Sequence, residues 1–295
     1  MSVGRITQRM LNTSGLASVQ TGLTRLGKVQ EQLTTGRILN RPSDNPADTT
    51  AAMRIRTGLA DQGQYARNAA DGVGWMTQID STLDSVTTAL SRARELAAQA
   101  ISGALGQASL DALAQEVDGL RANTVTLANA TYLDRPVFGG VTAGAAAYDD
   151  TGAYVGTPGQ VTRRIADGVN LRVDVDGRTV FGDGTGSAFD ELDALSTALR
   201  AGDTAGVQTA AAALKTRVDT VISARTAAGV TYARLQKAEV AAGDAELSLT
   251  TTLSSLENTD LAKATMDLQL QEVAYQASLA ATARVMQPSL IDFLR

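Results

Sequence analysis

The stretch MTQIDSTLDSVTTALSRARELAAQA, residues 76–100, decides the fold because its apolar residues recur at alternating steps of three and four. The recurring residues are Met76, Ile79, Leu83, Val86, Leu90, Ala93, Ala97 and Ala100. This spacing keeps side chains on one face of an α-helix, so it predicts a helix with an apolar stripe. Because no proline interrupts residues 47–101, we expect one helix through that whole segment. A helix about 80 Å long needs packing partners along its length.

A second apolar seam lies near the N-terminus. It comprises Leu16, Val19, Leu23, Leu26 and Leu33, with Gln30 in the one remaining place. The steps again alternate between three and four, which is the heptad pattern of helices that pack against a partner. Gly36 follows the seam and is predicted to end this helix as a C-terminal cap.

The next segment is a turn motif formed by Pro42, Ser43, Asp44, Asn45 and Pro46. Two prolines among short polar residues predict a loop. The motif also predicts a helix start, since Asn45 is a good N-cap and Pro46 suits the first helical position. This helix should therefore begin at the second proline.

Helices are also predicted after the long central one. Gly103 and Gly106 should end that helix, and Ser109 is predicted to cap another that runs to about residue 130. Ser187 and Asp190 have capping-box spacing before a short helix over 190–199. Further helices are expected over 204–228, from residue 230 to about 256, and over 261–286. The last has a wide apolar face that includes Met266, Leu268, Leu270, Val273, Tyr275, Ala277 and Leu279.

The middle of the chain is different, because aromatic residues and glycines gather between residues 132 and 189. Apolar and polar residues alternate from Val169 to Val175, which predicts a strand. The dipeptide Asp176-Gly177 predicts a type I′ hairpin turn into residues 178–181. Residues 160–166 are predicted to form a further strand. We expect a small β-rich insertion over residues 133–186.

The predicted fold is mainly α with a small β insertion, in a nested arrangement. Residues 1–40 with 258–295 should form a terminal helical domain, and residues 41–132 with 187–257 a helical core domain. Residues 133–186 should form a β-rich outer domain. The two ends of the chain carry apolar stripes, so they are expected to pair in an antiparallel coiled-coil bundle.

Composition excludes several classes of function. The chain has no cysteine and no histidine, so disulfides, thiolate zinc sites and His-dependent catalysis are excluded. The formal net charge of −5 without a basic run gives no reason to expect a nucleic-acid partner. No apolar stretch reaches transmembrane length, and residues 1–33 lack the apolar region of a cleavable signal peptide. We predict no catalytic residue, cofactor or metal site.

Several motifs resemble the flagellin-like proteins of the bacterial flagellum. They are Gly36-Arg37-Ile38 with the turn over 42–46, Gln64 to Asn68, Arg94 to Ala97, Arg225 to Gly229 with Tyr232 to Leu235, Tyr275 to Ala281, and Ser289 to Leu294. They stand in the family's order and at its distances from both termini, so the resemblance covers about residues 1–130 and 190–295. The turn and the Ser-Leu-Ile-Asp-Phe-Leu ending are similar to the family's junction proteins between hook and filament. Asn45 stands where their usual pattern has a second Asp.

The resemblance implies a structural protein that joins hook to filament and self-associates through its terminal helices. It also implies neighbours in the flagellum (a hook-associated protein and flagellin), type III export without a cleaved signal, and an extracellular location. A cytoplasmic export chaperone is expected to bind the C-terminal region, at Leu268, Val273, Tyr275, Leu290 and Phe293. Two alternatives stay open. One is flagellin itself, a filament subunit. The other is a cytoplasmic helical adaptor or enzyme, the location that composition alone favours.

Overall fold

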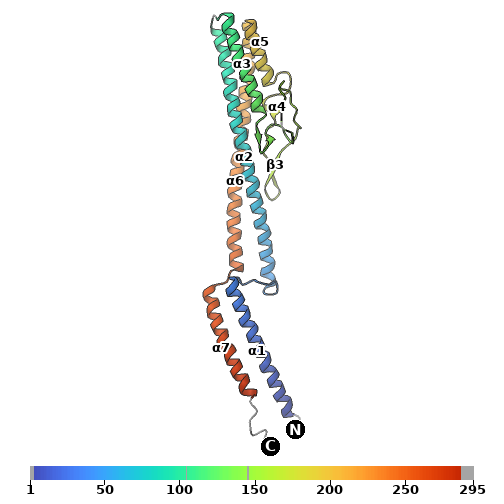
Figure 1. Ribbon diagram of the computed structural model, residues 1–295, viewed down its shortest axis with the longest axis vertical. Coiled ribbons are helices and arrows are strands. Elements are labelled where there is room, and N and C mark those ends of the chain that lie inside the picture. Colours follow the sequence, from blue (N-terminus) through green and yellow to red (C-terminus); the bar gives the residue numbers. More distant parts are fainter. Residues whose placement is uncertain (1–2, 104, 145, 287–295) are drawn as a thin grey trace. The chain divides into compact units, whose positions relative to one another are not determined.

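The structure, a computed structural model, describes residues 3–103, 105–144 and 146–286 (Figure 1). It is mainly helical with few short strands, as predicted. The helices are α1 (Val3–Thr35), α2 (Pro46–Ser102), α3 (Gln107–Ala128), α4 (Gly177–Val180), α5 (Ala188–Ala201), α6 (Thr204–Glu257) and α7 (Leu261–Met286). The strands are β1 (Thr131–Tyr132), β2 (Arg135–Pro136), β3 (Thr162–Ala166) and β4 (Val169–Arg172). The chain divides into two compact units, Met1–Ala60 with Leu247–Arg295 and Asp61–Glu246, which we call the terminal unit and the central unit.

Both predicted boundaries around the first turn are confirmed. Helix α1 ends at Thr35, and Gly36 follows with a φ of +68°, where a residue with a side chain would be strained. Helix α2 begins at Pro46. The side-chain oxygen of Asn45 accepts hydrogen bonds from the backbone N–H groups of Ala47 (3.1 Å) and Asp48 (3.2 Å), so Asn45 is the predicted N-cap.

The core of the central unit is built on the apolar stripe of α2. All of the stripe from Met76 to Ala97 is at most 1% exposed, and Ala100 is partly buried. Trp75, beside the stripe, is 1% exposed and therefore belongs to the core. Its ring meets the edge of Tyr132 at 5.7 Å, and the guanidinium of Arg135 lies over it at 5.7 Å. Burial of this stripe stabilises a helix that propensity alone would not hold.

Two helix predictions were wrong. Helix α3 is preceded by Gly106 as its N-cap, with no side-chain cap, so Ser109 lies inside the helix rather than at its start. Helix α6 is a single element of 54 residues, whereas two helices were predicted on either side of Gly229. A glycine inside a helix costs only about 1 kcal/mol, and the burial of Ala228 and Leu235 on one face of α6 outweighs that cost.

The capping pair predicted for α5 is confirmed, although the helix runs over Ala188–Ala201 rather than 190–199. The Ser187 hydroxyl accepts a hydrogen bond from the N–H of Asp190 at 3.2 Å, and the Asp190 carboxylate accepts one from the N–H of Gly186 at 2.8 Å. Helices α3 and α5 lie side by side in the central unit (Figure 1). The buried residues of α5 include Phe189, Leu192 and Leu195, which join the same core as α2.

The predicted hairpin at Asp176-Gly177 was wrong. There the chain forms the single helical turn α4, because the Asp176 carboxylate accepts the N–H of Arg178 at 2.9 Å and caps it. The observed hairpin lies upstream. Strands β3 and β4 are antiparallel with Ala166 opposite Val169, and Gly168 in the loop between them has a φ of +67°. The strand predicted over 160–166 is confirmed from Thr162 onward.

An aromatic cluster holds the rest of this region together. The rings of Phe138, Tyr148, Phe181 and Phe189 are buried and contact one another at centroid distances of 5.1–5.9 Å. The Tyr148 hydroxyl donates a hydrogen bond to the carbonyl of Gly182 at 3.0 Å. Burial raises the pKa of this phenol, so it stays protonated and can donate. Packed rings, more than strand pairing, therefore give this segment its structure.

Candidate assembly surfaces of the terminal unit

Helices α1 and α7 lie side by side and run in opposite directions (Figure 1). A Cβ added at Gly22 would lie 3.4 Å from Cδ2 of Tyr275, and one added at Gly15 would lie 3.2 Å from Cγ2 of Thr282. Lower numbers in α1 thus meet higher numbers in α7. The two glycines let the helix backbones approach closely, since no side chain stands between them.

The side of α7 that faces α1 is partly polar. Its least exposed positions are Ala264, Leu268, Gln271, Tyr275, Ser278 and Thr282. They recur at steps of three and four, which is the spacing of one helix face. Only some of these residues are apolar, so the pairing of α1 with α7 leaves much apolar surface of α7 unused.

The exposed apolar surface of α7 is part of the apolar face predicted from the sequence, since Leu268 and Tyr275 of that face are turned toward α1. Met266, Leu270 and Val273 are 65%, 63% and 64% exposed, and Ala277 and Leu279 are also exposed. At 100° per residue, the positions 266, 270, 273 and 277 lie on the opposite side of α7 from the α1-facing positions. We call these four residues the outward face of α7. Large apolar patches of this kind mark sites of association.

The seam predicted in α1 divides in the same way. Val19, Leu26 and Leu33 are partly buried, whereas Leu16 and Leu23 are 57% and 54% exposed. The residues that lie at the α7 side of the helix include Gly15 and Gly22, which the sequence pattern did not count because they carry no side chain.

The predicted chaperone-binding residues do not share one face. Leu268 and Tyr275 are turned toward α1, whereas Val273 belongs to the outward face. Leu290 and Phe293 lie outside the described residues. Within the described part, the C-terminal helix therefore presents one of the predicted residues on its surface and two in the α1 contact.

The turn motif is fixed by one carboxylate. The Asp44 side chain accepts hydrogen bonds from the backbone N–H groups of Arg41 (2.9 Å) and Asn40 (3.3 Å), and it pairs with Nζ of Lys28 in α1 at 3.0 Å. The hydrogen bond from Lys28, followed by that from the Arg41 N–H, lowers the pKa of Asp44. Pro42 and Ser43 are exposed at the tip.

A second buried carboxylate that joins elements of the terminal unit was not predicted from the sequence. Glu257, the last residue of α6, is 4% exposed. Its carboxylate pairs with Arg56 of α2 at 2.7 Å, and its backbone carbonyl accepts the N–H of Ile38 at 2.6 Å. Arg37 lies 3.9 Å from the same carboxylate. No pattern in the sequence pairs residues that are 201 positions apart.

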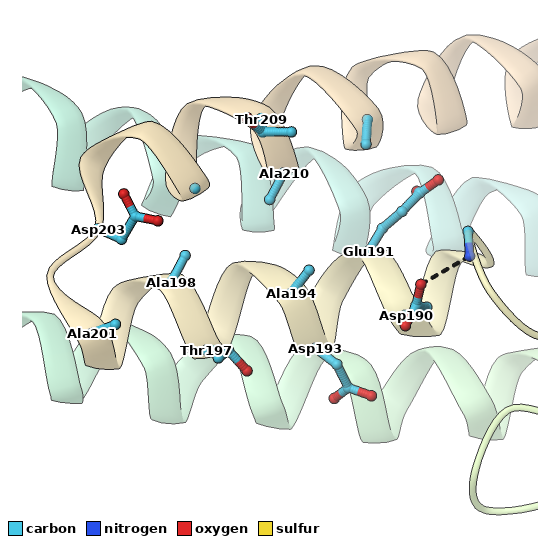
Figure 2. Close-up of a pocket in the computed structure, with 13 residues that line it drawn as sticks. Asp190, Glu191, Asp193, Ala194, Thr197, Ala198, Ala201, Asp203, Thr209 and Ala210 are labelled. Carbon is cyan, nitrogen blue, oxygen red and sulfur yellow. Dashed lines mark hydrogen bonds between the residues drawn. The ribbon is translucent and has the colours of Figure 1, made fainter.

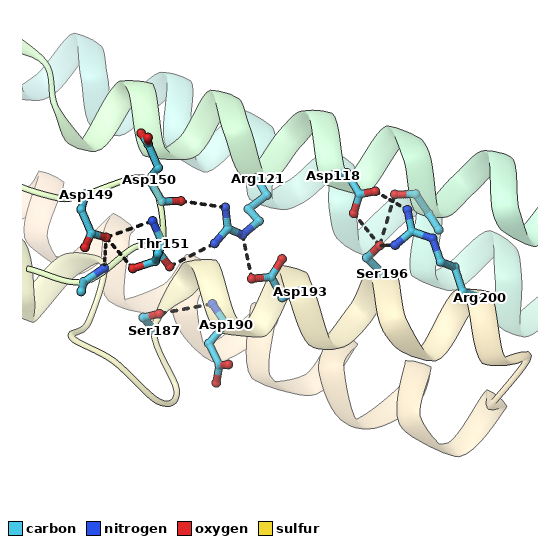
Figure 3. A network of polar contacts seen from close by, with 12 residues as sticks. Asp118, Arg121, Asp149, Asp150, Thr151, Ser187, Asp190, Asp193, Ser196 and Arg200 are labelled. Carbon is cyan, nitrogen blue, oxygen red and sulfur yellow. Dashed lines mark hydrogen bonds and ion pairs between the residues drawn. The ribbon is translucent and has the colours of Figure 1, made fainter.

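In the central unit, Arg121 joins α3 to α5 and to the loop at residues 149–151 (Figure 3). Its guanidinium pairs with Asp193 at 2.7 Å and donates to the carbonyls of Asp150 (3.3 Å) and Thr151 (3.0 Å). In the same loop, the Asp149 carboxylate accepts the Thr151 hydroxyl at 2.6 Å, the largest of the contacts that lower its pKa. These bonds hold the loop in place against α3 and α5.

A groove of about 770 Å³ lies between α5 and α6 (Figure 2). Alanines such as Ala194 and Ala210 form much of its lining, and Asp190 and Asp203 lie toward its ends. Glu191, which also lines it, is paired with Arg217 at 2.9 Å. Among the described residues, no group of three or more acidic, His or Cys side chains is placed to hold a metal ion. Nor does any helix in the described ranges combine the length and apolarity needed to cross a membrane.

Comparison with known proteins shows which families and structures this chain is similar to. Residues 6–136 match the family model of the bacterial flagellin N-terminal helical region. Flagellar hook-associated protein 3 of Salmonella typhimurium is 28% identical over 302 residues, which cover 93% of this chain and 94% of that protein. Flagellin of Salmonella muenchen is 31% identical, but over only 39% of this chain and 21% of that protein.

Among solved structures, FlgL of Bacillus cereus aligns with a TM-score of 0.61 at 24% identity. The alignment covers 68% of this chain and 99% of that one, so the two share a fold. The resemblance predicted from the motifs is confirmed. The chain therefore carries a match to the flagellin N-terminal helical region over residues 6–136 and is similar to flagellar hook-associated protein 3 along nearly its whole length.

Proposed function

We propose that this chain is a structural component of the bacterial flagellum that forms the junction between hook and filament by associating with further copies of itself through α1 and α7. The observation that carries the proposal is the outward face of α7, on which Met266, Leu270 and Val273 are all more than 60% exposed. Burying one large aliphatic side chain contributes about 1.5–3 kcal/mol, so a row of them is enough to hold neighbouring copies together.

The extent of similarity favours a junction protein over a filament subunit. Alignment with hook-associated protein 3 spans both ends and the middle of the chain, whereas alignment with a flagellin spans 116 residues. In the proposed assembly the paired terminal helices form concentric coiled-coil layers, and residues 133–186 lie on the outside. The proposed neighbours are a hook-associated protein on one side and flagellin on the other.

The proposal includes a route to the outside of the cell. The chain leaves unfolded through the flagellar type III apparatus without a cleaved signal, and it functions extracellularly. Before export, a cytoplasmic chaperone covers the C-terminal region around Val273, which keeps the outward face of α7 from associating too early.

A deletion strain examined by electron microscopy tests this function. We expect hooks without filaments, and flagellin shed into the medium. The wild-type chain should restore filaments, the double variant Leu270→Glu/Val273→Glu should not, and Gln99→Glu, which adds a charge at an exposed residue of α2 in the central unit, should. Normal filaments in the deletion strain would exclude the junction role. Full rescue by the double variant would exclude self-association through this face.

A second experiment tests the alternative that the chain is flagellin itself, a filament subunit. The purified chain is mixed with short filament seeds, and filament length is measured by electron microscopy. A junction protein should leave the seeds at their starting length. Growth of long filaments from the chain alone would make it a filament subunit.

A further inference from the structure

A pocket of about 270 Å³ lies in the terminal unit beside the turn between α1 and α2. Three arginines line it, Arg37, Arg41 and Arg56, together with the buried carboxylate of Glu257. We call these four residues and their cavity the arginine pocket. It combines basic side chains from the turn and from α2 with the end of α6.

The positive charge of the arginine pocket is only partly balanced within the chain. The Glu257 carboxylate lies 2.7 Å from the guanidinium of Arg56. The guanidinium of Arg37 is 3.9 Å from the same carboxylate, beyond hydrogen-bond distance. Arg41 pairs with Glu31 of α1 at 3.2 Å. All three arginine side chains are more than half exposed, so each keeps N–H groups that a ligand can reach.

The pocket also holds a polar atom with no partner. The hydroxyl oxygen of Thr49, whose residue lines the pocket, is buried and has no hydrogen bond within the described part of the chain. A buried hydroxyl without a partner costs about 1–3 kcal/mol, and an incoming acceptor removes that cost. An anionic oxygen satisfies both the hydroxyl and the guanidinium groups.

Unpaired carboxylates occur on α7 of the same unit. Among the described residues of the terminal unit, Asp267 and Glu272 are exposed and have neither an ion pair nor a hydrogen bond. They lie on opposite flanks of α7, between the outward face and the side that faces α1, at about 100° and 120° from Met266 around the helix. These two carboxylates are free to pair with a neighbouring copy that packs against α7.

We propose that the arginine pocket is a contact site between subunits, and that it receives Asp267 or Glu272 from α7 of a second copy. This inference rests on the proposed function. It adds a charged contact between subunits to the apolar contact made by the outward face of α7. Planar guanidinium groups bind carboxylates through paired hydrogen bonds, which fixes orientation as well as affinity. The contact joins different surfaces of two identical chains, so it sets the direction in which copies follow one another.

Charge reversal tests the inference in the full-length chain. The test variant is Arg41→Glu and the matched control is Arg54→Glu, which makes the same change at an exposed residue of α2 that lies outside the pocket. A further control, Glu31→Gln, breaks the pair of Arg41 within the chain but leaves the pocket's charge. The readout is the amount of each variant that sediments with flagella sheared from complemented deletion cells.

We expect Arg41→Glu to reduce incorporation at least tenfold, and both controls to incorporate as the wild type does. Adding Asp267→Arg or Glu272→Arg to Arg41→Glu should restore incorporation, because the charges are exchanged across the contact. Far-UV circular dichroism of the purified variants should show unchanged helix content, so that loss of folding does not account for the result.

Other outcomes overturn the inference. They are normal incorporation of Arg41→Glu, equal loss in Arg54→Glu, or no rescue by either reversal on α7. The proposed function has a separate test, since it fails if the deletion strain keeps its filaments. A strain that needs the chain for filaments but tolerates Arg41→Glu would retain the function and reject the arginine pocket.

Discussion

The guanidinium of Arg56 pairs with the buried carboxylate of Glu257 at 2.7 Å and joins the start of α2 to the end of α6. The Glu257 side chain is 6% exposed, whereas that of Arg56 is 51% exposed. The two partners are therefore unequal. Losing the arginine leaves a buried charge poorly compensated, whereas losing the carboxylate leaves an arginine that water can solvate.

This difference in burial predicts which of two substitutions lowers the free energy of unfolding more. Arg56→Met should lower the free energy of unfolding by about 1–3 kcal/mol, and Glu257→Gln by less, because the amide still accepts a hydrogen bond. Urea unfolding followed by far-UV circular dichroism gives both values. Arg54→Met, at an exposed position of the same helix, should stay within about 0.5 kcal/mol of the wild type. Equal effects at positions 54 and 56 would show that the pair with Glu257 is not stabilising.

Low pH should reduce the stability that the Asp44 carboxylate gives to the turn between α1 and α2. The Lys28 hydrogen bond holds the pKa of this carboxyl below its usual range, so its stabilising effect is present above about pH 4. The effect is lost as pH falls through the lowered pKa, because protonation removes the charge that Lys28 binds. Asp44→Asn should therefore lower the Tm at pH 6, and the difference from the wild type should shrink as the pH falls below about 4. Thermal melts at several pH values measure this. A Tm difference that does not change with pH would contradict it.

Close approach of α1 and α7 at Gly22 should not tolerate a large side chain. Gly22→Leu places its side chain against the Tyr275 ring, since the Cβ alone already lies 3.4 Å from it. We expect faster amide hydrogen exchange in the middle of α7. Gly27→Leu is the matched control, because no atom lies within 4 Å of a Cβ there. It should leave exchange in α7 unchanged, and removing a glycine should stabilise α1 by up to about 1 kcal/mol. Similar exchange in both variants would show that the helices are not in contact at Gly22.

Arg121 should control the order of the loop beside α3. Arg121→Ala removes the two hydrogen bonds to the carbonyls of Asp150 and Thr151, and we expect faster chymotrypsin cleavage after Tyr154. Cleavage is followed by mass spectrometry under native conditions. Arg92→Ala, which loses an exposed pair with Glu116, should be cleaved at the wild-type rate. An unchanged rate in the Arg121 variant would mean that the aromatic cluster alone holds the loop.

The sequence by itself determined the long helices α1 and α2 and the caps at their ends. The stripe from Met76 to Ala100 predicts α2 because one buried face of a long helix is a local, repeating pattern. Caps at Gly36, Asn45 and Ser187 were also predicted correctly, since each acts on backbone groups a few residues away. Local signals failed where two structures compete at the same dipeptide. Asp176-Gly177 suits both a hairpin turn and a helix N-cap, and in the structure the capping bond from Arg178 acts together with the packing of Phe181 among the other rings.

Tertiary structure alone decided which apolar residues become surface. The pattern marked Leu270 and Val273 as a helix face but did not say what covers it, and in the structure α1 packs on the other side of α7, where glycines allow close approach. Charge pairs such as that of Arg56 with Glu257 were likewise invisible, because their residues meet only after the chain has folded back on itself. Periodicity is a property of one helix, whereas exposure and ion pairing depend on which helices become neighbours.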